Sequence, residues 1–180
     1  MKTPLRPPIK RQAGAVLIIG LIMLLLLTML GVTSMRNSSM EERMSGNMRD
    51  QHLALQAAEA ALREAEAWLA PKNIKPTACL TVAASCDVFA AGKLPALQTQ
   101  TTTWWTTNAK EYGQTLSSVP TKPRYVIEEV AFLPDNLDLN RGTIGQGSTG
   151  RMLYRITARA TGQTADAVVI LQSTYSKRYN

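Results

Sequence analysis

The chain has 180 residues, and its 20 Lys and Arg against 13 Asp and Glu give a formal net charge of +7. This length accommodates one domain with appendages. Two Cys and a single His exclude a disulfide-dense scaffold and argue against a Cys/His zinc site. Four of the positive charges lie in residues 1–14, which contain no acid. The basic composition is therefore not in itself a sign of nucleic-acid binding.

Residues 15–35 predict a membrane-spanning helix, because this run contains nothing less apolar than Thr, Ser and Gly. About 20 such residues cross the hydrocarbon core of a bilayer, and a soluble helix would show a polar face. The alternative is a cleaved secretory signal, whose apolar region spans about 7–15 residues and ends in a small-x-small site that this run lacks. The basic leader, residues 1–14, should stay in the cytoplasm and direct residues 36–180 outward.

The helix is expected to continue through residues 36–70, which are rich in strong helix formers. Pro71 ends it, and a kink is expected at residues 45–47, where Gly weakens the helix. Apolar residues recur at steps of three, four and seven and should form one packing face: Met40, Met44, Met48, Leu55, Ala58, Leu62, Ala65 and Leu69.

Residues 71–180 predict a small β-rich domain that begins with an irregular segment, 71–100. Alternating and β-branched patterns mark strands, with the last one expected in the centre of the sheet. No helical pattern separates the strands, so the sheet should be antiparallel. The predicted fold is α+β, a long N-terminal helix whose outer half packs on a C-terminal antiparallel sheet. The expected strands are 125–133, 152–160 and 167–175, with 101–107 as a weaker candidate.

Together these features resemble a type IV pilin precursor: a basic leader ending in Gly14, an uncharged run from Ala15, an unbroken helix and a C-terminal β-domain. More specifically, the chain is similar to the PilX-type minor pilins. Residues 31–50, 55–65 and 154–175 carry that resemblance, whereas residues 71–150 carry nothing that we match to the family.

The resemblance implies that a prepilin peptidase cleaves after Gly14 and methylates Ala15. The alternative is that Gly14 merely precedes an uncleaved anchor. Two positions depart from the major-pilin pattern, which has Phe where this chain has Ala15 and Glu where it has Ile19. A carboxylate in the bilayer is costly and persists where it is used. Its absence puts repetitive polymerisation in doubt and favours an initiating subunit.

The resemblance also implies a role. The chain would be an inner-membrane protein with a periplasmic domain that joins other minor pilins and the major pilin, primes pilus assembly and stays near the pilus tip. Adhesion and motility would depend on it, and a tip adhesin is a further candidate partner. Two alternatives stay open, a tip pseudopilin of type II secretion and an uncleaved periplasmic adaptor.

Cys79 and Cys86 enclose six residues in a segment that we place outside the cytoplasm. A disulfide is expected in an oxidising compartment. Two free buried thiols are the alternative, and the spacing is not the C-x-x-C of redox-active pairs.

Trp104 and Trp105 would point to opposite faces of a strand, which places one in the core and the other at the surface or an interface. With Tyr112 they could instead form a stacking platform for a sugar or single-stranded DNA, but we expect no nucleic-acid partner. Arg155 and Arg159 share one strand face and are expected to be solvated, as are Lys177 and Arg178 at the end of the chain.

Residues 134–150 contain part of a calcium-loop pattern, but Thr149 occupies the position of its required acid. Gly20, Thr28, Gly31 and Thr33 are small residues that could allow close helix packing. His52 does not share a helix face with Asp50. We therefore predict no enzyme activity, no metal and no cofactor.

Overall fold

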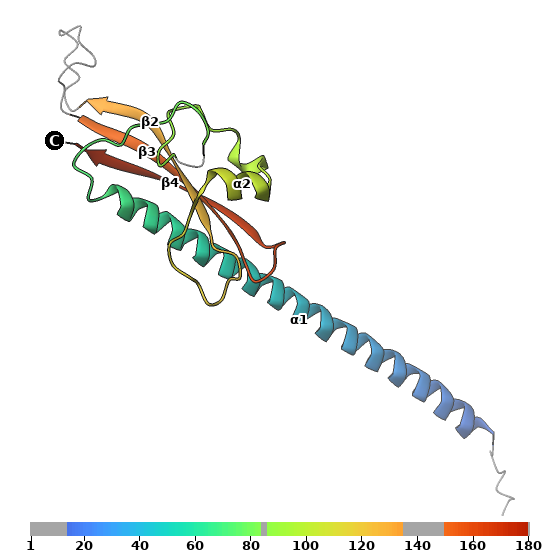
Figure 1. Ribbon diagram of the computed structural model, residues 1–180. Helices are drawn as coiled ribbons and strands as arrows, with labels where there is room; N and C mark the ends of the chain where they lie inside the picture. The colour runs from blue at the N-terminus through green and yellow to red at the C-terminus, as the bar shows by residue number, and fades with distance from the viewer. Residues whose placement is uncertain (1–13, 84–85, 135–149, 180) are drawn as a thin grey trace, which may run out of the picture. The chain divides into compact units, whose positions relative to one another are not determined.

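The computed structural model describes residues 14–83, 86–134 and 150–179. It consists of two compact units, the first ending at Gly46 and the second beginning at Asn47. The first unit is helical throughout its described part after Gly14. The second contains the rest of the helix and a four-stranded antiparallel sheet (Figure 1). This confirms the predicted α+β class.

The helix α1 extends over Ala15–Leu69, one residue short of the predicted end. Pro71 follows two residues later, where its ring prevents further helix. The helix is unbroken through residues 45–47, where a kink was expected.

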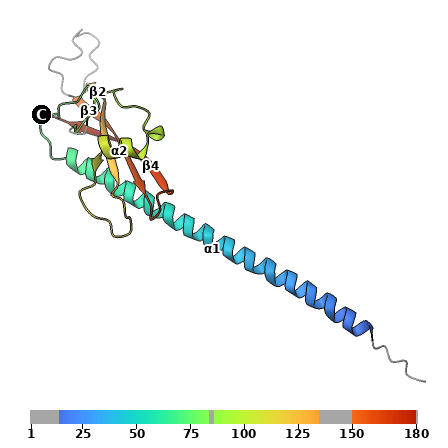
Figure 2. The same ribbon diagram turned by 45° about the vertical axis from the view of Figure 1, so that its right-hand side comes forward.

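The sheet has the order β1-β2-β3-β4, and every neighbouring pair is antiparallel. The three long strands extend the predicted ones by one to three residues at most ends, and the two-residue β1 was not predicted. A register shift between Glu129 and Ala131 interrupts the pairing of β2 with β3. Figure 2 shows the long strands running beside the second half of α1. The strands are β1 (Lys110–Glu111), β2 (Arg124–Pro134), β3 (Gly150–Thr161) and β4 (Val168–Arg178).

The prediction of a central last strand is wrong, because β4 is an edge strand. Its aliphatic residues are confined to the first four positions, 168–171. From Gln172 onward alternate residues are exposed, because one face of the strand is open to water. The apolar composition of its first residues therefore does not determine whether a strand lies at the centre or at the edge of the sheet.

The prediction of a strand over residues 101–107 is also wrong, since Thr102–Asn108 forms the short helix α2. The Thr101 side chain caps it by accepting a hydrogen bond from the Trp104 amide at 3.2 Å. The hydroxyls of Thr106 and Thr107 donate to the Thr103 carbonyl at 2.8 and 3.0 Å. These local bonds satisfy the threonines within the helix and outweigh their β propensity. A 3-10 turn at Leu97–Thr99 precedes the helix.

In the core between α1 and the sheet, the helix contributes a seam of mainly small residues and the sheet contributes large ones. On the helix, six positions are buried: Ala54, Ala57, Ala58, Ala61, Ala65 and Leu69. On β3, the predicted inward face is confirmed, with Met152, Tyr154, Ile156, Ala158 and Ala160 all buried. The three methionines of the predicted stripe, Met40, Met44 and Met48, are exposed instead. The packing face of the helix is therefore narrower and made mainly of alanine.

The opposite face of β2 is covered by α2 and the segment around the cysteines. Trp105, Phe89 and Val126 pack together there with Cys86 and Ala109. The Phe89 amide donates to Ile127 and the Phe89 carbonyl accepts from Glu129, both at 2.8 Å. The irregular segment is thus bonded directly to the edge of the sheet.

Candidate assembly surfaces

In the first unit, the apolar part of α1 is the candidate surface for the membrane or a filament. Residues 14–46 are all exposed, and this helix is long and apolar enough to cross a bilayer. The hydroxyls of Thr28 and Thr33 donate to helix carbonyls at 2.8 and 2.9 Å, so neither polar group is left without a partner. Gly20 and Gly31 have open space around them, which leaves room for another helix to approach.

Gly14 immediately precedes the first residue of α1 and is exposed. The predicted processing bond, between Gly14 and Ala15, thus joins two exposed residues at the start of the helix. Residues 1–13 lie outside the described residues. Cleavage and methylation stay predictions.

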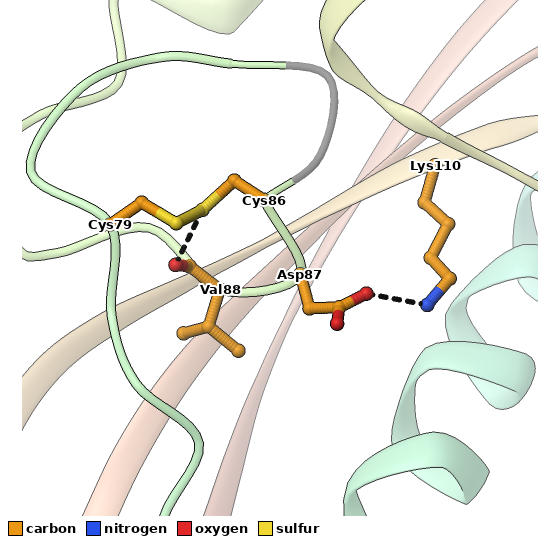
Figure 3. The surroundings of a disulfide bond; sticks show 5 residues. All are labelled: Cys79, Cys86, Asp87, Val88 and Lys110. Carbon is orange, nitrogen blue, oxygen red and sulfur yellow. Dashed lines mark hydrogen bonds and ion pairs between the residues drawn. A yellow bond between two sulfur atoms is a disulfide. The ribbon is translucent and has the colours of Figure 1, made fainter.

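In the second unit, Cys79 and Cys86 form a disulfide (Figure 3). The Cys86 Sγ lies 2.9 Å from the Val88 carbonyl oxygen, a contact without a proton because the sulfur is oxidised. Beside it, Asp87 pairs with Lys110 at 2.8 Å. The disulfide therefore closes the segment that delivers Val88 and Phe89, both buried, to the edge of β2.

Asp50 on α1 binds the turn between β3 and β4. Its carboxylate accepts hydrogen bonds from the Gln163 amide and from the Thr164 amide and hydroxyl. These bonds, above all the one from the Thr164 hydroxyl, lower the pKa of Asp50. Gly162 lies so close that a Cβ there would overlap the Asp50 carboxylate.

Glu64 forms a second link between α1 and the sheet. Its carboxylate accepts from the Gly113 amide at 3.0 and 3.2 Å and from the Tyr125 hydroxyl at 3.3 Å. Burial, with the Glu64 charge second, raises the pKa of Tyr125, which keeps the phenol protonated as the donor. Glu66 accepts from the Ser173 hydroxyl at 3.0 Å. Three acids of the helix, Asp50, Glu64 and Glu66, thus bond to the β-domain and hold it.

The expectation that Arg155 and Arg159 are simply solvated is wrong. Arg155 pairs at 3.3 Å with Glu128, a buried acid that also accepts from the Gly92 amide at 2.9 Å. Arg159 donates to the Thr102 hydroxyl at 3.1 Å, and partial burial lowers its pKa. Lys177 also has a partner, the Ala70 carbonyl.

The aromatic residues do not form a stacking platform. Trp105 is fully buried, and Trp104 meets it edge to face with ring centroids 5.6 Å apart. Tyr112 packs against the other cluster, with α1. One tryptophan is in the core and the other half-buried, as expected, although on a helix.

The described residues contain no group of three His, Cys, Asp or Glu placed to hold a metal ion. His52 is exposed. The calcium-like pattern of residues 134–150 lies outside the described residues except for its two ends.

Sequence reasoning missed Asp50, Glu64 and Gly162 as residues that join the helix to the sheet. Gly162 lies between two predicted strands, but its partner Asp50 lies 112 positions away in the sequence. Only a spatial arrangement brings them together.

Two family profiles match the chain. One, described as the PilX N-terminal region, covers residues 13–63, and the other, described as type IV pilus assembly protein PilX, C-terminal part, covers residues 79–177. The second match extends into residues 79–150, where the sequence alone suggested no relationship. No curated protein and no solved structure matches the chain. Both the helix and the β-domain are accounted for, so the chain belongs to the PilX family of type IV pilus assembly proteins.

Proposed function

We propose that this protein is a minor pilin that helps to prime type IV pilus assembly and forms part of the complex at the pilus tip. The observation that carries the proposal is the family match over both the helix and the β-domain. Its role is structural, in contact with other minor pilins, the major pilin and a tip adhesin.

The exposed apolar helix supports a route from the inner membrane into the filament. Burying it against lipid, and later against other helices, removes from water a surface that a soluble protein would not leave open. Cleavage between Gly14 and Ala15 would remove four leader charges and keep the helix. A signal peptidase would instead cut beyond the helix and lose it.

Ile19 supports a role in priming the filament rather than repeated incorporation of the subunit along it. It lies within the apolar run, at the position where the resemblance expects an acid that contacts the neighbouring subunit. A subunit that begins the filament has less need of that contact.

The test of function is a deletion strain, complemented with the wild-type gene. We expect few surface pili and lost twitching motility in the deletion strain, with both restored by complementation. Normal piliation together with a secretion defect would point instead to type II secretion. Normal piliation and secretion would overturn the proposal.

The test of processing is the intact mass and N-terminal residue of protein purified from its native membrane. We expect a mature chain that starts at methylated Ala15. A chain that retains Met1 would make the protein an uncleaved anchor, and a chain that begins beyond Met35 would reveal a secretory signal.

A further inference from the structure

The two edges of the sheet differ in how they are protected. At the β2 edge, β1 pairs with Arg124 and Tyr125, and Phe89 bonds to the next residues along the strand. The bulge after Glu129 and the terminal Pro134 follow. Short edge strands, bulges and prolines are the features with which proteins prevent unwanted strand pairing.

The β4 edge is long and continuous, and its only charged residues are Lys177 and Arg178 at its end. Its 11 residues contain neither Pro nor Gly, and the register with β3 is uninterrupted from Thr161↔Val168 to Arg151↔Arg178. The Gly162 amide donates to the Ala167 carbonyl, which makes these two residues a hydrogen-bonded pair of the β3–β4 ladder. Hydrogen-bonded and non-hydrogen-bonded pairs alternate in an antiparallel ladder, so the odd-numbered residues of β4 bond to β3. Amides of even-numbered residues therefore point away from β3: Ile170, Gln172, Thr174 and Ser176. Within the described chain, no hydrogen bond to these four amides is found.

Basic residues outnumber acids around this edge, where Glu128 of β2 pairs with Arg155 and Glu66 of α1 bonds to Ser173. Strands β3 and β4 carry five basic residues and no acid: Arg151, Arg155, Arg159, Lys177 and Arg178. In the sheet, Arg155 is the neighbour of Thr174 and Arg159 of Ile170. Arg155 keeps 45% of its side chain exposed although it pairs with Glu128. An incoming strand would therefore lie in a positive field, which favours acidic side chains.

A second copy of the chain does not supply those acids. Antiparallel pairing of two β4 strands about Ser173 would set Lys177 opposite Val169, and parallel pairing would set Lys177 beside its own equivalent. Like charges directly opposite each other destabilise a sheet. The complementary occupant is a different chain.

We propose that β4 is an acceptor edge, to which an extended, acidic segment of another subunit of the pilus adds as a fifth strand. Main-chain bonds to the four outward amides supply affinity, and the basic side chains select the partner. This inference rests on the proposed function, because the partner belongs to the same assembly.

The first test compares Gln172→Pro with Gln172→Ala in the chromosomal gene. Proline removes one outward N–H and no bond to β3, a position where edge strands accept it. We expect the purified full-length variants, in detergent, to unfold at the same temperature, whereas Gln172→Pro alone loses surface pili. Normal piliation in Gln172→Pro would overturn the inference.

The second test keeps the backbone and serves if the proline variant does not fold. Ser176→Glu adds an acid and Ser176→Lys a base at an exposed edge position whose cross-strand neighbour is the uncharged Leu153. We expect Ser176→Glu to lose pili and Ser176→Lys to keep them. Equal piliation in the two variants would overturn the inference that the partner segment is acidic.

A third measurement separates this inference from the proposed function. A photoreactive benzoylphenylalanine replaces Thr174 in living cells, and the crosslinked adducts are separated by mass. This readout does not depend on the result from the deletion strain. We expect one heterologous adduct that Gln172→Pro removes and Gln172→Ala retains. An adduct of twice the chain's own mass would identify a second copy as the occupant and overturn the inference, as would the absence of an adduct.

Discussion

Asp50 on α1 and Thr164 in the β3–β4 turn are joined through both the amide and the hydroxyl of the threonine, although they lie 114 residues apart. Asp50 is the last residue of one stretch that resembles the family, and Thr164 lies within another. The two stretches are therefore in contact, and together they fix one end of the sheet on the helix.

The first prediction is that Asp50→Asn destabilises the protein in a pH-dependent way. The folded protein lowers the pKa of Asp50, so its contribution is present above the ordinary pKa and disappears as the pH falls through the lowered value. We expect a lower unfolding temperature than wild type at pH 7 and a difference that shrinks below about pH 4.

Thermal unfolding of the full-length protein in detergent, measured across pH, checks this. Asp166→Asn is the matched control, because that carboxylate in the same turn makes no hydrogen bond in the described structure. Identical curves for Asp50→Asn and wild type at neutral pH would contradict the prediction.

The second prediction is that Gly162→Ala destabilises the fold by about 1–3 kcal/mol, as overpacking does. A Cβ at this position would lie 2.5 Å from the Asp50 carbonyl oxygen, which belongs to the helix backbone and cannot move away. Denaturant unfolding measures the loss. Gly113→Ala is the control, since its nearest neighbour would be a Glu64 side-chain oxygen at 3.4 Å; equal losses at the two glycines would refute the argument.

The third prediction concerns the disulfide. Opening the short loop between Cys79 and Cys86 should lower the free energy of unfolding by about 2–3 kcal/mol through the entropy of the unfolded chain. Unfolding with and without reductant measures it, and Cys79→Ser combined with Cys86→Ser should reproduce the reduced protein. No change on reduction would show that Phe89 holds the segment without the disulfide.

The fourth prediction separates the two tryptophans. Trp105→Ala should cost about 3–5 kcal/mol, because the side chain is fully buried against Phe89 and Val126. Trp104→Ala should cost clearly less, since that ring is half-buried and its amide keeps its bond to Thr101. Denaturant unfolding of both variants decides, and the reverse order would be incompatible with the described packing.

The long elements could be predicted from sequence because each has a strong repeating pattern. Uninterrupted helix formers up to Pro71 predict α1, and alternation along β3 identifies its buried face. The helix α2 was missed because Thr101 acts as a cap, which the run of β-branched residues obscured. The edge position of β4 was missed because strand order depends on contacts between segments, not on the composition of one.

The residues of the candidate surfaces also divide into those that a local sequence pattern identifies and those that only a contact in the fold identifies. The disulfide could be predicted because the two cysteines lie close together in the sequence, whereas processing at Gly14 and Ala15 stays a prediction. Asp50 and Glu64 look like ordinary exposed helix acids, and only their partners, at Thr164 and Tyr125, reveal what they do. Arg155 is paired because Glu128 faces it from the neighbouring strand, which no spacing within β3 predicts.

The alanine seam has a consequence for how the protein is made. The helix is synthesised first, and its sheet partner β3 lies among the last residues of the chain. At about 5–20 residues per second, the outer half of the helix waits several seconds for that partner. Alanine exposes less apolar surface than leucine during this interval, so the nascent helix is less exposed to aggregation. Small side chains at the seam thus protect an unfinished chain as well as pack a finished one.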